Sequence, residues 1–313
     1  MTPMRVFLFL LAATALPAAD LRLGIIGTDT SHAVAFTALL NDPANKNHLP
    51  GARVVAAYKG GSTDIKESSS RVDKYAEELS TKYGVELAPD IPTLLTKVDA
   101  ILLESVDGRK HLEQFRQIAK SGKPVFIDKP LASSLADARE IARLADENHV
   151  KWFSASVLRF SDVLPTLKLE GLNGVYAWGP GPLEEHHQLS LSWYGVHTVE
   201  TLYTMMGRGC DEVTFTGSDE ADVVTGKWKD GRIGTIRVIR PYSAFGVTAF
   251  SAKAIKTNEK DLYTGYQNLV KEIIQFFQTG KAPIDAQETL EMFEFMDAAQ
   301  RSKAAGGAPT KLR

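Results

Sequence analysis

Short apolar runs alternate with amphipathic segments over the first half of the chain. Continuous apolar runs predict buried strands, and apolar residues repeated every three or four positions predict helices. Strands are predicted at 21–26, 52–58, 100–103 and 124–127, helices at 33–40, 71–83, 91–97, 111–121 and 135–148, and a polar loop at 59–70. Buried strands separated by helices indicate a parallel sheet covered on both faces, as in the doubly wound α/β folds.

The pattern changes after about residue 150. Strands are predicted at 151–157, 174–178, 212–216, 223–229, 232–239 and 247–255, and helices at 193–206, 265–279 and 286–304. The turn Lys229-Asp230-Gly231-Arg232 is a strong hairpin signal, and strands grouped in this way predict a mostly antiparallel sheet. The tail Ala304–Pro309 (AAGGAP) is expected to be a loose end or a short linker. We therefore expect a Rossmann-like doubly wound domain at 20–149 and an α+β domain with a mostly antiparallel open sheet at 150–313.

The first nineteen residues follow a different pattern. Arg5 precedes an apolar run at 6–16, and Pro17-Ala18-Ala19 ends the run with small residues. This layout predicts a cleavable Sec-type signal peptide and an exported protein, periplasmic or secreted. A buried N-terminal strand or helix is the alternative, which the better strand starting at Leu21 disfavours. No later run reaches 18 apolar residues, so we expect no membrane span.

Composition narrows the class of protein. Hydrophobic residues at 44% and charged residues at 24% are ordinary globular values, which excludes wholesale disorder. The net charge of −2 lacks the basic excess of a nucleic-acid binder, so no nucleic-acid partner is expected. The single cysteine, Cys210, excludes an intrachain disulfide and a cysteine-based zinc or iron–sulfur site.

One segment carries a specific pattern, His111–Ala132 (HLEQFRQIAKSGKPVFIDKPLA). It has a histidine, a helix ending in Gly122-Lys123, a strand, and then Asp128-Lys129-Pro130. This segment resembles the Gfo/Idh/MocA oxidoreductases, which have Glu-Lys-Pro where this chain has Asp128-Lys129-Pro130. Further resemblance at 158–160, at 195–200 and in the final helices extends over nearly all of the chain after residue 20. The resemblance implies a nicotinamide cofactor (NAD or NADP) on the first domain, a carbohydrate-like substrate beside the second sheet, and a homo-oligomer.

The resemblance also implies roles for single residues. Lys129 would lie between nicotinamide and substrate as a catalytic group, unless it is only a solvated charge at a strand end. His197 would be an acid–base group, unless it is a core histidine. Where the family has a carboxylate four residues earlier, this chain has Trp193, which would form a stacking wall for a sugar ring. The predicted substrate contacts are Lys129, Arg159, His187, Trp193 and His197.

The departures from the family lie at the expected cofactor site. In the turn 27–32, Gly27 stands at the first glycine position of a dinucleotide turn, but Asp29 and His32 stand at the second and third. A carboxylate facing a pyrophosphate would cost roughly 1–3 kcal/mol. The alternative is an ordinary strand-to-helix turn with Asp29 or Thr30 as the N-cap. Glu104, after the third apolar strand, adds a second acid to the expected cofactor crevice.

The second strand is followed by Lys59 instead of the usual acid. With Ser62 and Thr63, Lys59 would hold a ribose phosphate and favour NADP, unless this stretch is a solvated loop. The predicted cofactor contacts are Gly27, Thr28, Asp29, Thr30, Ser31, His32, Lys59, Glu104, Ser105, His111, Asp128 and Lys129.

A cluster at 184–187 (EEHH) raises the question of a metal site. Glu184, His186 and His187 are suitable ligand types, but no H-E-x-x-H spacing is present and adjacent strand residues point to opposite faces. We expect no metal and a polar substrate contact from one of the two histidines.

Two functions from different classes follow. The first is an NAD(P)-dependent oxidoreductase acting on a sugar- or polyol-like hydroxyl. The alternative is an exported, non-redox protein that cleaves or binds a carbohydrate on the same fold, with a degenerate or tightly held cofactor.

Overall fold

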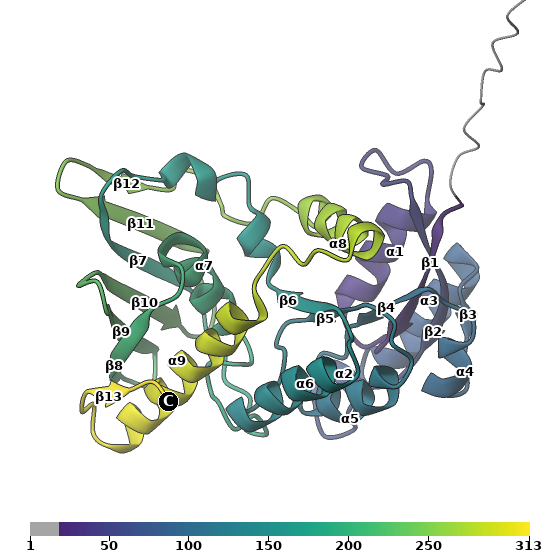
Figure 1. Ribbon diagram of the computed structural model, residues 1–313, viewed down its shortest axis with the longest axis horizontal. Helices are drawn as coiled ribbons and strands as arrows, with labels where there is room; N and C mark the ends of the chain where they lie inside the picture. The colour runs from purple at the N-terminus through teal and green to yellow at the C-terminus, as the bar shows by residue number, and fades with distance from the viewer. Residues whose placement is uncertain (1–18) are drawn as a thin grey trace, which may run out of the picture.

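The computed structural model describes residues 19–313, which form two sheets joined by helices (Figure 1). Residues 1–18 of the expected signal peptide lie outside the described residues. Within the described part of the chain, no helix is long and apolar enough to cross a membrane.

The first sheet has six parallel strands in the order β3-β2-β1-β4-β5-β6. The strands β1 to β3 are added toward one edge of the sheet, and β4 to β6 are added toward the other edge. Doubly wound sheets bind ligands where this order reverses, which here is between β1 and β4. The expected Rossmann-like parallel sheet is confirmed. Its strands are β1 (Leu21–Ile26), β2 (Ala52–Tyr58), β3 (Glu86–Leu87), β4 (Ala100–Leu103), β5 (Val125–Asp128) and β6 (Trp152–Ala155). The helices between them are α1 (Ser31–Asn41), α2 (Lys66–Ser69), α3 (Val72–Tyr83), α4 (Ile91–Leu95), α5 (Gly108–Ala119) and α6 (Leu135–Glu147).

The second sheet has seven strands in the order β12-β11-β7-β10-β9-β8-β13. All neighbouring strands are antiparallel except β7 and β10, so the expected mostly antiparallel sheet is confirmed. Buried and partly exposed residues alternate along β7, β9 and β10, since α7 and α9 pack on the sheet and cover the buried positions. The strands are β7 (Leu172–Pro180), β8 (Cys210–Gly217), β9 (Ala221–Trp228), β10 (Ile233–Ile239), β11 (Gly246–Ser251), β12 (Ile255–Thr257) and β13 (Thr310–Lys311), and the helices α7 (Val196–Met206), α8 (Gln267–Thr279) and α9 (Ala286–Ala304).

The two sheets are tied together by segments that return to the first sheet. Two 3-10 turns, η1 (Val157–Phe160) and η2 (Leu164–Leu167), connect β6 to β7. Helix α8 packs against α1 and η1, although it follows β12 in the chain (Figure 1). Helix α9 packs on both α6 and β8. These contacts bring the carboxyl ends of the parallel strands opposite the second sheet.

Four local predictions differ from the structure. The stretch 59–70 is not only a loop, because Lys66–Ser69 forms α2 and the hydroxyl of Ser68 donates to the buried carboxylate of Asp29 at 2.6 Å. The strand expected at 151–157 ends at Ala155, and η1 begins two residues later at Val157. The strand expected at 247–255 is two strands that form a hairpin, β11 and β12. Strand β3 was not expected, because only two exposed residues pair there.

A fifth difference lies in the tail, where the expectation of a loose end or linker is wrong. The hydroxyl of Ser302 donates to the carbonyl of Ala308 at 2.7 Å and accepts from the amide of Phe215 at 3.0 Å. The chain then adds Thr310–Lys311 to β8 as an antiparallel edge strand. The glycine-rich stretch is therefore a tight turn into the second sheet.

Candidate active site

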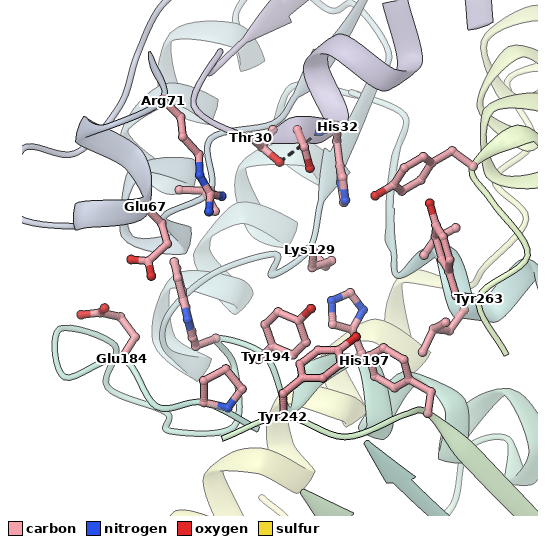
Figure 2. A pocket seen from close by; sticks show the side chains of 18 of the residues that line it. Thr30, His32, Glu67, Arg71, Lys129, Glu184, Tyr194, His197, Tyr242 and Tyr263 are labelled. Carbon is pink, nitrogen blue, oxygen red and sulfur yellow. Dashed lines mark hydrogen bonds between the residues drawn. The ribbon is translucent and has the colours of Figure 1, made fainter. Parts of the chain in front are cut away.

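A cavity of about 610 Å³ lies between the carboxyl ends of the parallel strands and the second sheet. This volume is within the range of small-molecule sites. Figure 2 shows side chains from both sheets pointing into it. The first sheet and the helices that follow its strands contribute Thr30, Ser31, His32, Glu67, Arg71, Val106 and Lys129, and the rest of the wall includes Glu184, Trp193, Tyr194, His197, Tyr242, Phe245, Asp261, Tyr263 and Tyr266.

Lys129 follows directly after β5, with a cis peptide bond to Pro130. Its ammonium nitrogen lies 6.0 Å from the ring centroid of Tyr194, across the cavity wall. Burial lowers the pKa of Lys129, and the Arg71 guanidinium lowers it further, while Asp128 opposes the shift. The amine is therefore neutral more often than an exposed lysine, which suits a group that accepts or donates a proton.

His197 lies in the first turn of α7 and faces the same cavity. Its Nδ1 lies 2.7 Å from the hydroxyl of Ser156, and the rings of Tyr194 and Phe245 pack edge-on against it. Burial lowers the pKa of His197 well below its usual value, and the charges of Lys129 and His32 add to the effect. His197 is therefore a neutral imidazole at pH 7, which can accept a proton from a bound hydroxyl.

Aromatic side chains form much of the remaining wall. Trp193 lies one turn before His197 and lines the cavity, as do Tyr242 and Tyr263. Such side chains present an apolar face for contact and, in tyrosine, a hydroxyl for hydrogen bonding. The wall can therefore hold a ring that has an apolar face and a polar edge.

Several expected site residues lie outside this cavity, among them Gly27, Ser105 and Asp128, and three others are buried in contacts with other protein groups. Arg159 is buried in ion pairs with Glu200 and, at 2.7 Å, with Glu288. His187 is buried with Nε2 at 3.2 Å from Asp107 and Nδ1 at 3.0 Å from Ser192. His111 is fully buried between the carbonyls of Leu131 and Ser105. Each of these residues contacts other protein groups instead of the cavity.

The turn after β1 is closed in a way that the sequence did not indicate. Gly27 has φ of +97°, and a Cβ there would lie 2.3 Å from the backbone nitrogen of Ser105, so only glycine fits. Thr28 and Asp29 are both 0% exposed. The Thr28 hydroxyl donates to the carbonyl of Val72 at 2.9 Å, and the Asp29 carboxylate accepts from Ser68 at 2.6 Å. The segment around α2 therefore covers the position of the second glycine, and Asp29 does not face the cavity.

The other two charged cofactor candidates also lie away from the cavity. Lys59 forms an exposed ion pair with Asp73 at 2.8 Å. Glu104 is fully buried, and within the described residues neither of its carboxyl oxygens has a hydrogen-bond partner. Burial raises the pKa of Glu104 well above its usual value, with Asp128 and Asp29 adding to the shift. Burial therefore favours the neutral form of Glu104, and neither Asp29 nor Glu104 lines the cavity as expected.

Several wall residues were not among the sequence candidates. Arg71 and Glu67 come from the segment around α2, and Tyr242, Tyr263 and Tyr266 come from loops flanking the strand pair β11 and β12. The aromatic residues at 242–266 are a visible cluster in the sequence, but periodicity alone does not show that their loops turn toward the first sheet.

The residues at 184–187 do not converge on a metal. His186 Nδ1 lies 2.5 Å from Glu184, while His187 turns away toward Asp107. Within residues 19–313, no group of three or more histidine, cysteine, aspartate or glutamate side chains has the arrangement of a metal site.

The cavity fits a nicotinamide dinucleotide only in part. The start of α1 at Thr30 and Ser31, with Arg71 across the cavity, offers backbone amides and a cation to an anionic group. Lys129, Tyr194 and His197 form the other end, where a ring and a hydroxyl-bearing substrate would meet. At the second glycine position, Asp29 is buried beneath the segment around α2, so the backbone there cannot approach a pyrophosphate. The cavity therefore fits a nicotinamide ring and a substrate better than it fits the pyrophosphate at the glycine turn.

Known proteins resemble this chain in sequence and in fold. Residues 21–156 match the model of the oxidoreductase family with an NAD-binding Rossmann fold. An uncharacterized oxidoreductase of Streptococcus pneumoniae serotype 4 is 26% identical over 165 residues, which is 47% of this chain and 45% of that protein. The 2,7-anhydro-N-acetylneuraminate hydratase of Mediterraneibacter gnavus is 27% identical over 191 residues, 55% of this chain and 47% of that protein. The matches thus span less than half the length of either relative.

Solved structures share the fold over nearly the whole chain. The myo-inositol dehydrogenase of Lactobacillus casei, in complex with NAD(H) and myo-inositol, has a TM-score of 0.72 at 17% identity and covers 94% of this chain and 97% of that one. Fold and cavity together define a two-sheet protein of the NAD-binding Rossmann class. Residues 21–156 match the Gfo/Idh/MocA family of oxidoreductases with an NAD-binding Rossmann fold.

Proposed function

We propose that this protein is an NAD- or NADP-dependent oxidoreductase that acts on a hydroxyl of a sugar- or polyol-like substrate. One observation carries the proposal: Lys129, His197 and Trp193 line a single cavity at the switch point of the parallel sheet, facing the second sheet. The family match supports the reaction type, and the dehydrogenase complex with myo-inositol supports the substrate class.

The residues of this chain divide the work as follows. Trp193 and Tyr194 hold a ring face, and neutral His197 or Lys129 accepts the proton of the substrate hydroxyl as its carbon is oxidised. Thr30, Ser31 and Arg71 would hold the anionic part of a dinucleotide, and Lys129 would lie beside its nicotinamide. A bound nicotinamide supplies the hydride acceptor.

A specific observation favours a second function. Complete burial of Thr28 and Asp29 closes the contact through which a dinucleotide turn approaches pyrophosphate. A non-redox protein that cleaves or binds a carbohydrate in the same cavity needs no such contact. One sequence relative is named a hydratase of a sugar derivative, and the addition of water is not a redox reaction.

Release of bound nucleotide separates the two functions. The purified protein is denatured and the small molecules are identified by mass spectrometry, and melting temperature is measured with added NAD⁺ or NADP⁺. The oxidoreductase predicts about one nucleotide per chain or stabilisation by one of the two cofactors. No nucleotide and no stabilisation by either, with stabilisation by a carbohydrate, would favour the second function instead.

We also propose that the protein is exported and self-associates. The sequence of residues 1–19 supports export through a Sec-type signal. The partly exposed residues on the face of β7, β9 and β10 that α7 and α9 leave uncovered support association through this sheet. N-terminal sequencing of the protein from its native host and light scattering of the purified protein test the two points separately.

A further inference from the structure

A histidine and a carboxylate from the first sheet form a pair in the cavity wall that the roles above do not use. His32 lies in the first turn of α1, and Asp128 is the last residue of β5. The two are 96 positions apart in the chain, but Nδ1 of His32 lies 2.6 Å from Oδ2 of Asp128. The Asp128 side chain is 3% exposed, whereas the His32 side chain is 10% exposed and lines the cavity.

The ring of His32 is held in one orientation. Phe36 stacks against it at a centroid distance of 5.5 Å, and Tyr266 meets it edge-on at 4.8 Å. Figure 2 shows the ring pointing into the cavity toward Lys129 and His197. Within residues 19–313, Nε2 forms no hydrogen bond, while Nδ1 is engaged by Asp128. The free nitrogen is therefore the one presented to a ligand.

Asp128 has the charge needed to fix this arrangement. Burial acts to raise its pKa, but the neighbouring His32 and Lys129 outweigh burial and hold the pKa of Asp128 below its usual value. An ionised carboxylate accepts a hydrogen bond, so Nδ1 carries the proton and Nε2 has a free lone pair. The same carboxylate stabilises the imidazolium that forms when Nε2 takes up a proton.

The surrounding charges limit how many protons the site holds. Lys129 and His197 face His32 across the cavity, and Tyr266 packs on its ring. The charge of His32 contributes to the lowered pKa of His197, so a protonated His32 disfavours protonation of His197. Glu104 lies close enough to Asp128 for that charge to raise the pKa of Glu104.

We propose that His32 is an acid–base catalytic residue of this cavity and that Asp128 is its positioning residue. In the forward direction Nε2 takes the proton from a hydroxyl of a polyhydroxylated substrate: the O–H bond breaks, an N–H bond forms, and the electron pair stays on the substrate oxygen. The pair provides a histidine–carboxylate combination beside the cavity, whereas the ring of His197 is paired with the hydroxyl of Ser156. The role rests on the proposed function only in that the cavity is a catalytic site.

Reaction with diethyl pyrocarbonate tests the pair without a known substrate, because this reagent acylates accessible neutral imidazole nitrogens. Peptide mass spectrometry of the treated protein follows His32, with buried His111 as the unreactive reference. We expect His32 to be modified at least ten-fold faster than His111. In Asp128→Asn, which removes the charge that holds the proton on Nδ1, we expect His32 to be modified at least three-fold more slowly than in the wild type, because the side-chain amide can donate to Nδ1 and so move the ring proton to Nε2. An inert His32, or an unchanged rate of His32 modification in Asp128→Asn, would overturn the proposal.

Nuclear magnetic resonance of ¹⁵N-histidine-labelled protein provides the second readout. We expect His32 to carry its proton on Nδ1 at high pH, and an Nε2-protonated ring would contradict the proposal. Once a substrate is turned over, His32→Gln should lower kcat by about 10²–10⁴-fold and remove one limb of the pH profile, while His48→Gln, away from the cavity, should do neither. If labelling behaves as expected but no nucleotide is bound, the redox function fails and the pair stands; the reverse result removes the pair alone.

Discussion

Arg159 offers a sharp test, because sequence and structure give it different roles. The resemblance implies a substrate contact, but the guanidinium lies in η1, buried against Glu200 of α7 and Glu288 of α9. The side chains of Arg159 and Glu200 are 11% and 4% exposed. We predict that Arg159→Met, which keeps most of the volume, unfolds more easily and leaves the cavity intact.

The magnitude follows from the burial of the pair. Removing one partner of a buried ion pair leaves an uncompensated charge and costs about 3–5 kcal/mol. For a chain of this size, that corresponds to a fall in melting temperature of roughly 5–8 °C. Burial already raises the pKa of Glu200 while Arg159 opposes the shift, so the variant should raise it further. A carboxyl whose pKa is higher folded than unfolded loses stability as pH rises, so the deficit should shrink from pH 8 toward pH 5.

Urea unfolding at several pH values measures this prediction. The double variant Arg159→Met with Glu200→Gln should recover part of the loss, because the stranded carboxylate is gone. Wild-type stability of Arg159→Met, together with weakened substrate binding, would refute the structural role and restore the one that the resemblance implies.

Two further variants test other parts of the account. Gly27→Ala should lower the free energy of unfolding by more than about 2 kcal/mol, because a left-handed φ is combined with a Cβ that would lie 2.3 Å from Ser105. The control Gly84→Ala, with φ of +67° and nothing within 4 Å of its Cβ, should lower it by only about 1–2 kcal/mol. Equal losses in thermal unfolding would contradict the close packing at Gly27. Because the pKa of Glu104 is raised in the folded protein, the wild type should lose stability as pH rises above the ordinary pKa of a glutamate. The variant Glu104→Gln should lack this pH dependence of stability between pH 5 and 8. An unchanged pH dependence in the variant would show that Glu104 is not its source.

Local patterns were sufficient for the first sheet and for most helices. The apolar runs of β1, β2, β4 and β5 predict buried parallel strands because both faces of each are covered. The tail has no such signal. Its strand, β13, depends on Ser302 binding the amide of Phe215, 87 positions away. Contacts at this separation leave no trace in periodicity.

The candidate site shows the same division. Lys129, His197 and Trp193 were found from a motif and helical spacing, and the structure brings them to one cavity. The sequence places Asp29 and Glu104 at the correct strand ends, but it does not show that the segment around α2 covers the turn. The pairing of His32 with Asp128 was equally hidden, since each residue fitted a separate part of the cofactor pattern.

Turnover measured at 340 nm tests the central claim most directly. The protein is incubated with NAD⁺ or NADP⁺ and a panel of polyols and sugars, beside Lys129→Met and the control His48→Gln. The account predicts reduction of one cofactor by a member of the panel, a loss of about 10²–10⁴-fold in kcat for Lys129→Met, and no loss for His48→Gln. Full activity in Lys129→Met would contradict it.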